Sequence, residues 1–228
     1  YKERIIKMGE EPWRVYNVGQ PGLESIVKLK LLTKEELENE LGLKFDKKVF
    51  LITYHPVTLD AQNTEEQIVN LIKAISKFEA KYIFTYPNAD YGNKIIIDKV
   101  NQFKQNYNDA FVFHSLGQVK YLSLMKYADV MVGNSSSGII ESPSFKLPVV
   151  NIGDRQKGRI RNKNIIDVGY DTAEIVEGIN KALYDEQFIS SLNNLDNVYG
   201  DGTTSEKVVN ILKKIVINER LLCKRLIY

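Results

Sequence analysis

The chain has 228 residues, of which 43% are hydrophobic and 26% charged, with a formal net charge of +2. This composition is ordinary for a globular protein with one good-sized core or two small ones. The small net charge gives no strong electrostatic field for binding nucleic acid, and no apolar run of about 18 residues indicates a membrane span.

The N-terminal stretch "YKERIIKMGEEPWR" is charged throughout, so it lacks the pattern of a secretory signal. The single cysteine, Cys223, cannot form an internal disulfide. We therefore expect a reducing, cytoplasmic setting. Because the chain begins without methionine in charged, helix-like sequence, we also expect it to be part of a longer protein.

Short apolar segments rich in Val, Ile, Phe and Tyr predict strands along the chain. Several are continuously apolar, which is typical of strands buried on both faces of a parallel sheet. The predicted strands cover residues 14–19, 47–55, 81–87, 110–116, 128–134, 147–153 and 164–170.

Helical segments alternate with these strands. Thr33 and Glu36 predict a capping box for a helix over 33–42 that ends at Gly42, and Thr64 and Gln67 predict a similar start for a helix over 64–78. Further helices are predicted over 91–106, 118–128, 171–185 and, from a Thr203–Glu206 capping box, to near the C-terminus.

This alternation predicts βαβ units and an α/β fold with a Rossmann-like, doubly wound parallel sheet. We expect one α/β domain from about Arg14 to Asn197, followed by the glycine-containing break "NVYGDGTTSEK" before the last helix.

The stretch "GNSSSGIIES", residues 133–142, occupies a predicted strand-to-helix corner. Ligands of doubly wound sheets bind beyond the carboxyl ends of the strands. Gly133 and Gly138 would allow a tight turn and a close backbone approach, and serine hydroxyls with helix N–H groups suit a phosphate. The alternative is a plain serine N-cap.

Glu141 lies close to where such an anion would sit. A carboxylate there would repel a phosphate unless it faced away, and it could accept hydrogen bonds from a ribose diol. The alternative is a glutamate that interacts only with the dipole of its own helix.

Polar residues follow several other predicted strands, and together they would form one rim with donors, cations and carboxylates. Taken singly, the histidines could be structural and the basic residues could belong to a solvated loop. No histidine or cysteine spacing indicates a metal site, and the P-loop pattern is absent. The rim residues are His55, Asn88, Asp90, His114, Ser115, Gly117, Asp154, Arg155, Lys157 and Arg159.

The strings "HPVT", "GNSSSG" and "GDRQKGR", in this order and spacing, resemble the C-terminal half of the hydrolysing UDP-N-acetylglucosamine 2-epimerases. Those enzymes make N-acetylmannosamine and UDP for sialic-acid-type sugars. The related non-hydrolysing enzymes have an "HRREN"-like string in place of "HPVTLD" and a "GG" pair with two glutamates in place of "SSSGIIES", so the resemblance favours the hydrolysing branch.

The resemblance implies one half of a GT-B-type two-domain fold. Residues 1–13 would be the remnant of an interdomain linker helix, 14–197 the UDP-binding domain and 198–228 a C-terminal crossover helix. It implies no cofactor and no metal, and it puts the catalytic carboxylates in the N-terminal domain, outside this chain. If that domain is missing, an exposed apolar stripe on the last helix would favour a homo-oligomer.

The resemblance also assigns contacts with UDP or UDP-N-acetylglucosamine. His55 would meet the pyrophosphate, Asn88 would line the nucleotide site, and His114, Ser115 and Leu116 would cradle the uracil. Ser135 and Ser136 would bind phosphate, Glu141 the ribose hydroxyls and Arg155 the UDP part. The alternatives are the C-terminal domain of a GT-B glycosyltransferase and a non-catalytic module that binds nucleotide sugars.

Overall fold

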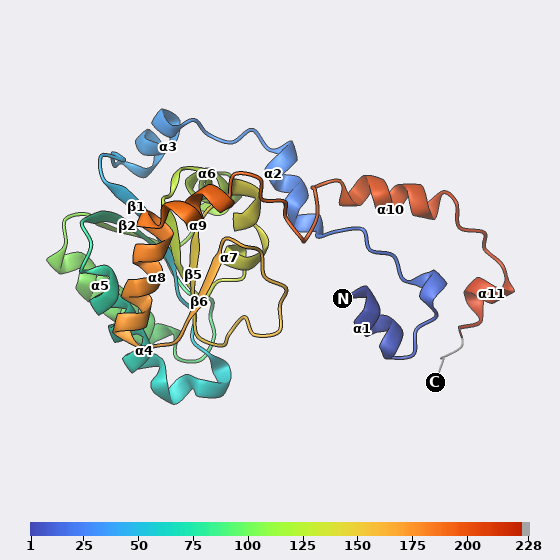
Figure 1. The fold of residues 1–228 in the computed structure, drawn as a ribbon, viewed down its shortest axis with the longest axis horizontal. Coiled ribbons are helices and arrows are strands. Elements are labelled where there is room, and N and C mark those ends of the chain that lie inside the picture. The colour runs from blue at the N-terminus through green and yellow to red at the C-terminus, as the bar shows by residue number, and fades with distance from the viewer. Residues whose placement is uncertain (225–228) are drawn as a thin grey trace. The chain divides into compact units, whose positions relative to one another are not determined.

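The structure, a computed structural model, describes residues 1–224. These residues form two compact units: Tyr1–Lys28 with the described residues from Tyr199 onward, and Leu29–Val198. Residues 14–28 belong to the first unit, whereas the α/β sheet lies entirely in the second (Figure 1).

The second unit contains a six-stranded parallel sheet in the order β3-β2-β1-β4-β5-β6. The chain steps outward from β1 to β3 and then returns to the other side of β1 with β4. The strand order therefore reverses between β1 and β4, and this confirms the predicted doubly wound sheet. The strands are β1 (Lys48–Thr53), β2 (Ala80–Thr85), β3 (Ala110–Phe113), β4 (Val130–Gly133), β5 (Val149–Ile152) and β6 (Ile165–Val168).

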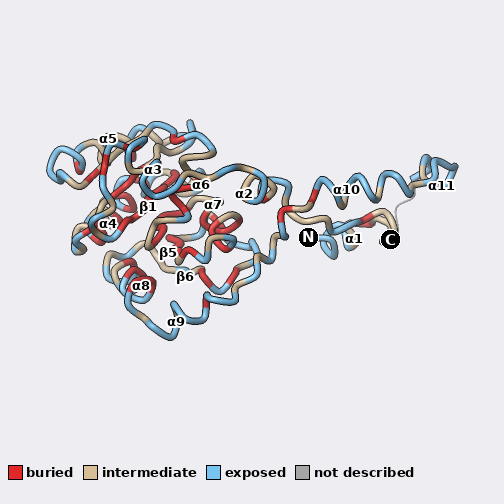
Figure 2. Tube along the Cα trace, turned by 90° about the horizontal axis from the view of Figure 1, so that it is seen from above, coloured by how far each residue is buried: buried red, intermediate tan, exposed pale blue. Residues whose placement is uncertain are grey.

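Helices cover both faces of this sheet (Figure 1). Helices α4, α5 and α8 pack on one face, where Phe50, Ile52 and Phe84 belong to the main hydrophobic core. Figure 2 shows the buried residues concentrated around the strands. The helices of the unit are α3 (Lys34–Leu41), α4 (Thr64–Ile75), α5 (Asn93–Asn106), α6 (Gly117–Tyr127), α7 (Ser137–Ile140), α8 (Thr172–Tyr184) and α9 (Glu186–Ser191), with 3-10 turns at Thr58–Asn63 and Ser142–Phe145.

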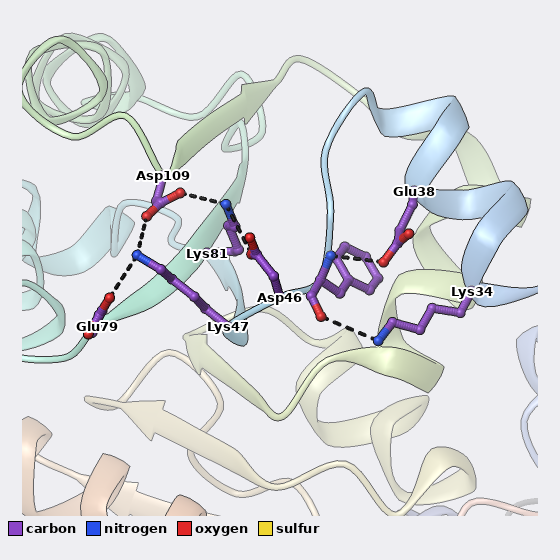
Figure 3. Close-up of polar contacts among 8 residues, drawn as sticks. Lys34, Glu38, Asp46, Lys47, Glu79, Lys81 and Asp109 are labelled. Carbon is purple, nitrogen blue, oxygen red and sulfur yellow. Dashed lines mark hydrogen bonds and ion pairs between the residues drawn. The ribbon is translucent and has the colours of Figure 1, made fainter.

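Paired charges gather at the starts of β1, β2 and β3, at the amino edge of the sheet (Figure 3). Asp109 accepts from Lys47 at 2.9 Å and from Lys81 at 2.6 Å. Lys47 also pairs with Glu79 at 2.8 Å, and Lys81 pairs with Asp46 at 3.2 Å. These five charges therefore satisfy one another.

The first unit holds α1 (Lys2–Lys7), α2 (Glu24–Lys28), α10 (Thr204–Leu212), α11 (Glu219–Leu222) and 3-10 turns at Pro12–Arg14 and Pro21–Leu23. The strand predicted over 14–19 was wrong. Those residues have no paired strand among the described residues, because they lie in the first unit and the sheet lies in the second.

Only one of the three predicted capping boxes forms. In α3, Thr33 Oγ1 accepts from Glu36 N at 3.2 Å, Glu36 Oε2 accepts from Thr33 N at 2.8 Å, and Gly42 ends the helix at φ 67°. Thr64 lies inside α4, because a 3-10 turn runs directly into the helix. Thr203 precedes α10, but its hydroxyl donates to Asp201 at 2.6 Å instead of capping the helix.

The last predicted helix is interrupted after Leu212 and resumes at α11, where Asn218 Oδ1 caps Leu221 N at 3.0 Å. The β-branched run Ile215, Val216 and Ile217 lies in the break. The end of this prediction, residues 225–228, lies outside the described residues. No helix within residues 1–224 is long and apolar enough to cross a membrane.

Candidate functional site

The predicted site residues all follow the carboxyl ends of strands, in the loops at one edge of the sheet. This edge includes the point between β1 and β4 where the strand order reverses, which is where ligands of doubly wound folds bind. His55 follows β1, Asn88 follows β2, His114, Ser115 and Leu116 follow β3, Ser135, Ser136 and Glu141 follow β4, and Arg155 follows β5.

His55 is a buried histidine, with 6% of its surface exposed. Its Nδ1 accepts from the Asn88 backbone N–H at 3.1 Å, so the proton of the neutral ring is on Nε2. Burial lowers the pKa of His55 to about 4; nearby Arg155 acts in the same direction and Asp90 opposes it. His55 is therefore a neutral hydrogen-bond donor near pH 7.

The serine turn between β4 and α7 carries a connected set of hydroxyls. Ser135 Oγ lies 2.9 Å from Ser137 Oγ, which lies 2.6 Å from the hydroxyl of Tyr121 on α6. Burial raises the pKa of Tyr121, so this phenol keeps its proton. No described residue accepts from the Ser136 hydroxyl or from the N–H groups of Ser135 and Ser136, which leaves these donors for a ligand.

The two glycines of this turn serve the packing of the protein itself. Gly133 has φ 139°, and a Cβ there would lie 2.0 Å from the carbonyl oxygen of Thr53 on β1. A Cβ at Gly138 would lie 3.0 Å from Val149 Cγ1 on β5. The close backbone approach predicted at these glycines is therefore an approach between elements of the sheet unit.

Glu141 directly follows the single turn of α7. Its Oε2 is buried and has no hydrogen-bond partner. Burial raises the pKa of Glu141, while a hydrogen bond within the residue and the charge of Arg159 act in the opposite direction. A buried carboxylate oxygen without a donor is costly for a folded protein, so it fits a ligand that brings hydroxyl donors.

The basic residues after β5 differ in their surroundings. Arg155 is half-buried and donates from Nη1 to the Asn134 carbonyl at 3.2 Å; burial lowers its pKa, although Asp90 opposes this. Lys157 is exposed and lies 3.9 Å from Asp154. The prediction of a solvated loop therefore fits Lys157, whereas Arg155 turns back toward the end of β4.

The residues after β3 form a separate part of the rim. The His114 ring meets Tyr86 edge-on, with centroids 5.7 Å apart. Ser115 Oγ accepts from Gly117 N at 3.2 Å, and Leu116 is buried at the start of α6. No hydrogen bond between described residues joins His114, Ser115 or Leu116 to the serine turn.

Three residues of the site were not predicted from the sequence: Asn134, Gln156 and Tyr121. Asn134 and Gln156 share a hydrogen bond of 2.8 Å between the loops after β4 and β5. Asn134 follows an apolar strand directly, so the rule used for the other rim residues could have found it. Tyr121 lies within an amphipathic helix, and no sequence pattern there distinguishes a tyrosine of the site from one that only packs in the core. Among residues 1–224, no group of three or more His, Cys, Asp or Glu side chains could hold a metal ion.

Comparison with solved structures defines the class of the fold. The chain superposes on a UDP-GlcNAc 2-epimerase from Neisseria meningitidis bound to UDP-GlcNAc with a TM-score of 0.67 at 21% identity, covering 94% of this chain and 58% of that one. A putative UDP-N-acetylglucosamine 2-epimerase from Listeria monocytogenes gives a TM-score of 0.74 at 13% identity, covering 93% and 56%. The fold is one Rossmann-like half of a GT-B-type structure, as predicted.

Sequence comparison then gives the family. The family model described as UDP-N-acetylglucosamine 2-epimerase matches residues 1–213, and the chain belongs to this family. A GDP/UDP-N,N'-diacetylbacillosamine 2-epimerase (hydrolyzing) from Campylobacter jejuni is 49% identical over 73% of this chain and 44% of its own length. Polysialic acid biosynthesis protein P7 from Escherichia coli is 41% identical over 95% and 55%. The chain therefore spans about half the length of the curated relatives it matches.

Proposed function

We propose that this chain is the UDP-binding half of a hydrolysing UDP-N-acetylglucosamine 2-epimerase, which converts UDP-N-acetylglucosamine into N-acetylmannosamine and UDP. One observation carries the proposal: the buried, unpartnered carboxylate oxygen of Glu141 lies one helical turn beyond the free donors of Ser135 and Ser136. A nucleoside diphosphate would satisfy both groups. Its ribose hydroxyls would donate to Glu141, and its phosphates would accept from Ser135 and Ser136.

In this proposal the diphosphate binds to the Ser135 and Ser136 donors, with Arg155 as the counter-charge and the His55 Nε2–H as a neutral donor. Charge-assisted hydrogen bonds of this kind are stronger than neutral ones. The ribose diol donates to Glu141, Asn88 lines the nucleotide site, and the backbone of 114–116 surrounds the uracil. Burial destabilises the charged form of Arg155 in the free protein, and an ion pair with the diphosphate would offset that effect.

The chemistry proposed for the whole protein has two steps. A base removes the proton at carbon 2 while the bond between carbon 1 and oxygen breaks, so UDP leaves and a 2-acetamidoglucal-like alkene remains. Water then adds across the double bond, with a proton to carbon 2 and hydroxide to carbon 1, giving the inverted sugar. Donors aimed at the leaving diphosphate act most strongly in the transition state, where its charge grows.

We assign the proton transfers to residues outside this chain. Glu141 is proposed to hold the ribose, and the carboxylates at the amino edge are paired with lysines. The relatives named above include one for diacetylbacillosamine and one for polysialic acid biosynthesis, which supports a UDP-linked 2-acetamido sugar as the substrate class and sialic-acid-type sugars as the use of the product.

Calorimetry with UDP, and NMR detection of products, tests this proposal. We expect the 228-residue chain to bind UDP without turning over UDP-N-acetylglucosamine or UDP-N,N'-diacetylbacillosamine. Absence of UDP binding would contradict the site. Robust release of N-acetylmannosamine by this chain alone would contradict the assignment of the proton transfers to other residues. In the longer protein, consumption of the sugar nucleotide without an acceptor sugar would exclude a glycosyltransferase.

A further inference from the structure

Asn134 joins the two loops on either side of the point where the strand order reverses. It is fully buried, with 0% of its surface exposed. Its Oδ1 accepts from the His55 N–H at 2.7 Å, and its Nδ2 donates to the His55 carbonyl at 2.8 Å. Its own N–H donates to the Thr53 carbonyl at 3.2 Å. The side-chain amide thus pairs with the backbone of His55 beyond the end of the β1–β4 ladder.

The backbone carbonyl of Asn134 connects to a third loop. It accepts from Arg155 Nη1 at 3.2 Å and from Gln156 Nε2 at 2.8 Å, and both donors come from the loop after β5. One residue therefore contacts the loop after β1 through its side chain and the loop after β5 through its carbonyl. His55 and Arg155, the neutral donor and the cation of the proposed site, are both among its partners.

A side-chain amide suits this position because it carries a donor and an acceptor on one planar group. A carboxylate would lose the donor to the His55 carbonyl, and a hydroxyl could not reach both backbone groups at once. Fixing the His55 backbone also sets the ring, whose Nδ1 must meet the Asn88 N–H for Nε2 to carry the proton. The orientation of His55 therefore depends on Asn134.

We propose that Asn134 is a positioning residue: its side chain holds the His55 donor, and its backbone carbonyl orients the Arg155 side chain, so that both face a diphosphate before the ligand binds. This inference rests on the proposed function. Side chains that are already ordered in the free protein lose less conformational entropy on binding. Ordering His55 and Arg155 in advance therefore raises the affinity for the phosphates and not for the nucleoside.

The test compares Asn134→Ala with Asn164→Ala in the 228-residue chain. Asn164 is a matched control, because it is equally buried and lies directly before β6, where its Nδ2 donates to Ser142 Oγ at 2.9 Å and to the Leu147 carbonyl at 2.7 Å. Calorimetry would measure the affinity of each variant for UDP and for uridine. We expect Asn134→Ala to weaken UDP binding about tenfold and to change uridine binding less than about twofold, because only the phosphate contacts depend on the two lost hydrogen bonds. Asn164→Ala should change neither affinity.

A second readout follows the imidazole directly by ¹H–¹⁵N NMR at the side chains of the two histidines, assigned with His114→Gln. In the wild-type chain His55 should show the Nε2–H tautomer and a pKa well below its ordinary value. In Asn134→Ala its pKa should move back toward 6.5 with a mixture of tautomers. Asn134→Ser, which removes less volume, replaces the alanine variant if that one does not fold.

The outcomes separate the two ideas. If the wild-type chain binds no UDP, the proposed function is wrong. If it binds UDP and the Asn134 variants keep that affinity, or lose UDP and uridine affinity equally, Asn134 has no positioning role. An unchanged His55 tautomer and pKa in those variants would likewise overturn it.

Discussion

At the scale of single residues, the phosphate donors can be tested one at a time. Ser136→Ala removes one neutral donor and should weaken UDP binding several-fold, whereas Arg155→Ala removes a half-buried counter-charge and should weaken it about tenfold or more. Lys157→Ala is the control, because that side chain is exposed. Unchanged UDP affinity of both variants by calorimetry would mean that the phosphates bind elsewhere.

Glu141 should cost the free protein stability. Its pKa is raised in the folded state by burial, so the folded protein holds this proton more tightly than the unfolded chain does. Stability from this group is therefore present below about pH 4.5, its unfolded value, and is lost as the pH rises through the folded pKa. We expect Glu141→Gln to raise the free energy of unfolding at pH 7 by about 1 kcal/mol and to give no gain at pH 4.

Glu141→Gln should also lose recognition of the ribose hydroxyls. The wild-type chain should bind UDP more tightly than 2′-deoxy-UDP, and Glu141→Gln should bind the two with similar affinity, because the ribose hydroxyls lose a charged acceptor. Urea denaturation and calorimetry measure the two effects. A variant that is no more stable at pH 7 and still discriminates between the nucleotides would show that Glu141 has another partner.

The pKa of His55 predicts a pH dependence of the free energy of unfolding that is opposite in sign to that of Glu141. Its folded pKa of about 4 lies below the unfolded value of 6.5, so the unfolded chain binds the proton more readily. The stability from this residue is present above about pH 6.5 and is lost as the pH falls toward 4, by about 3 kcal/mol in total. His55→Gln should flatten the dependence in this window, as measured by urea denaturation between pH 4 and 7. His114→Gln is the control, since that ring is exposed.

At the scale of elements, the corner between β4 and α7 depends on Gly133. With φ 139° and the Thr53 carbonyl oxygen 2.0 Å from the site of a Cβ, alanine there must displace β1 or β4. We expect Gly133→Ala to lower the free energy of unfolding by about 3 kcal/mol or more. Gly42→Ala is the matched control, because Gly42 also has positive φ but has open space around it, so it should cost only about 1 kcal/mol. Equal losses in chemical denaturation would mean that strain in φ, and not the contact, decides the cost.

The elements themselves were largely predictable, and the errors have a common cause. Short segments rich in Val, Ile, Phe and Tyr identified all six strands of the sheet, because β-branched and aromatic residues favour strands. The false strand at 14–19 has the same local composition, but a strand also needs a paired neighbour. The Thr64 and Thr203 capping boxes failed because the pattern does not say whether the threonine is the N-cap or whether a nearer acceptor takes its hydroxyl.

At the scale of the whole molecule, α10 and the residues from its end to Lys224 leave apolar side chains exposed, among them Leu212, Val216 and Ile217. Exposed apolar side chains of this kind favour association between proteins. We expect a second copy of this chain to cover them. We expect a concentration-dependent dimer in sedimentation experiments. Leu212→Lys with Ile217→Asp should shift the equilibrium toward the monomer, while Glu3→Lys in α1 serves as the control. A monomer at all concentrations would contradict this prediction.

The sequence by itself determined the order of strands and helices, the polar residues at the strand ends and the family, because each can be recognised from local composition or from short sequence motifs. Only the tertiary structure decided that β4 lies beside β1, that His55 is neutral and that the Oε2 atom of Glu141 has no hydrogen-bond partner among the described residues. It also identified Asn134, whose side chain bonds to a residue 79 positions away. These properties depend on burial and on hydrogen bonds between distant segments, and no local pattern records which segments will meet.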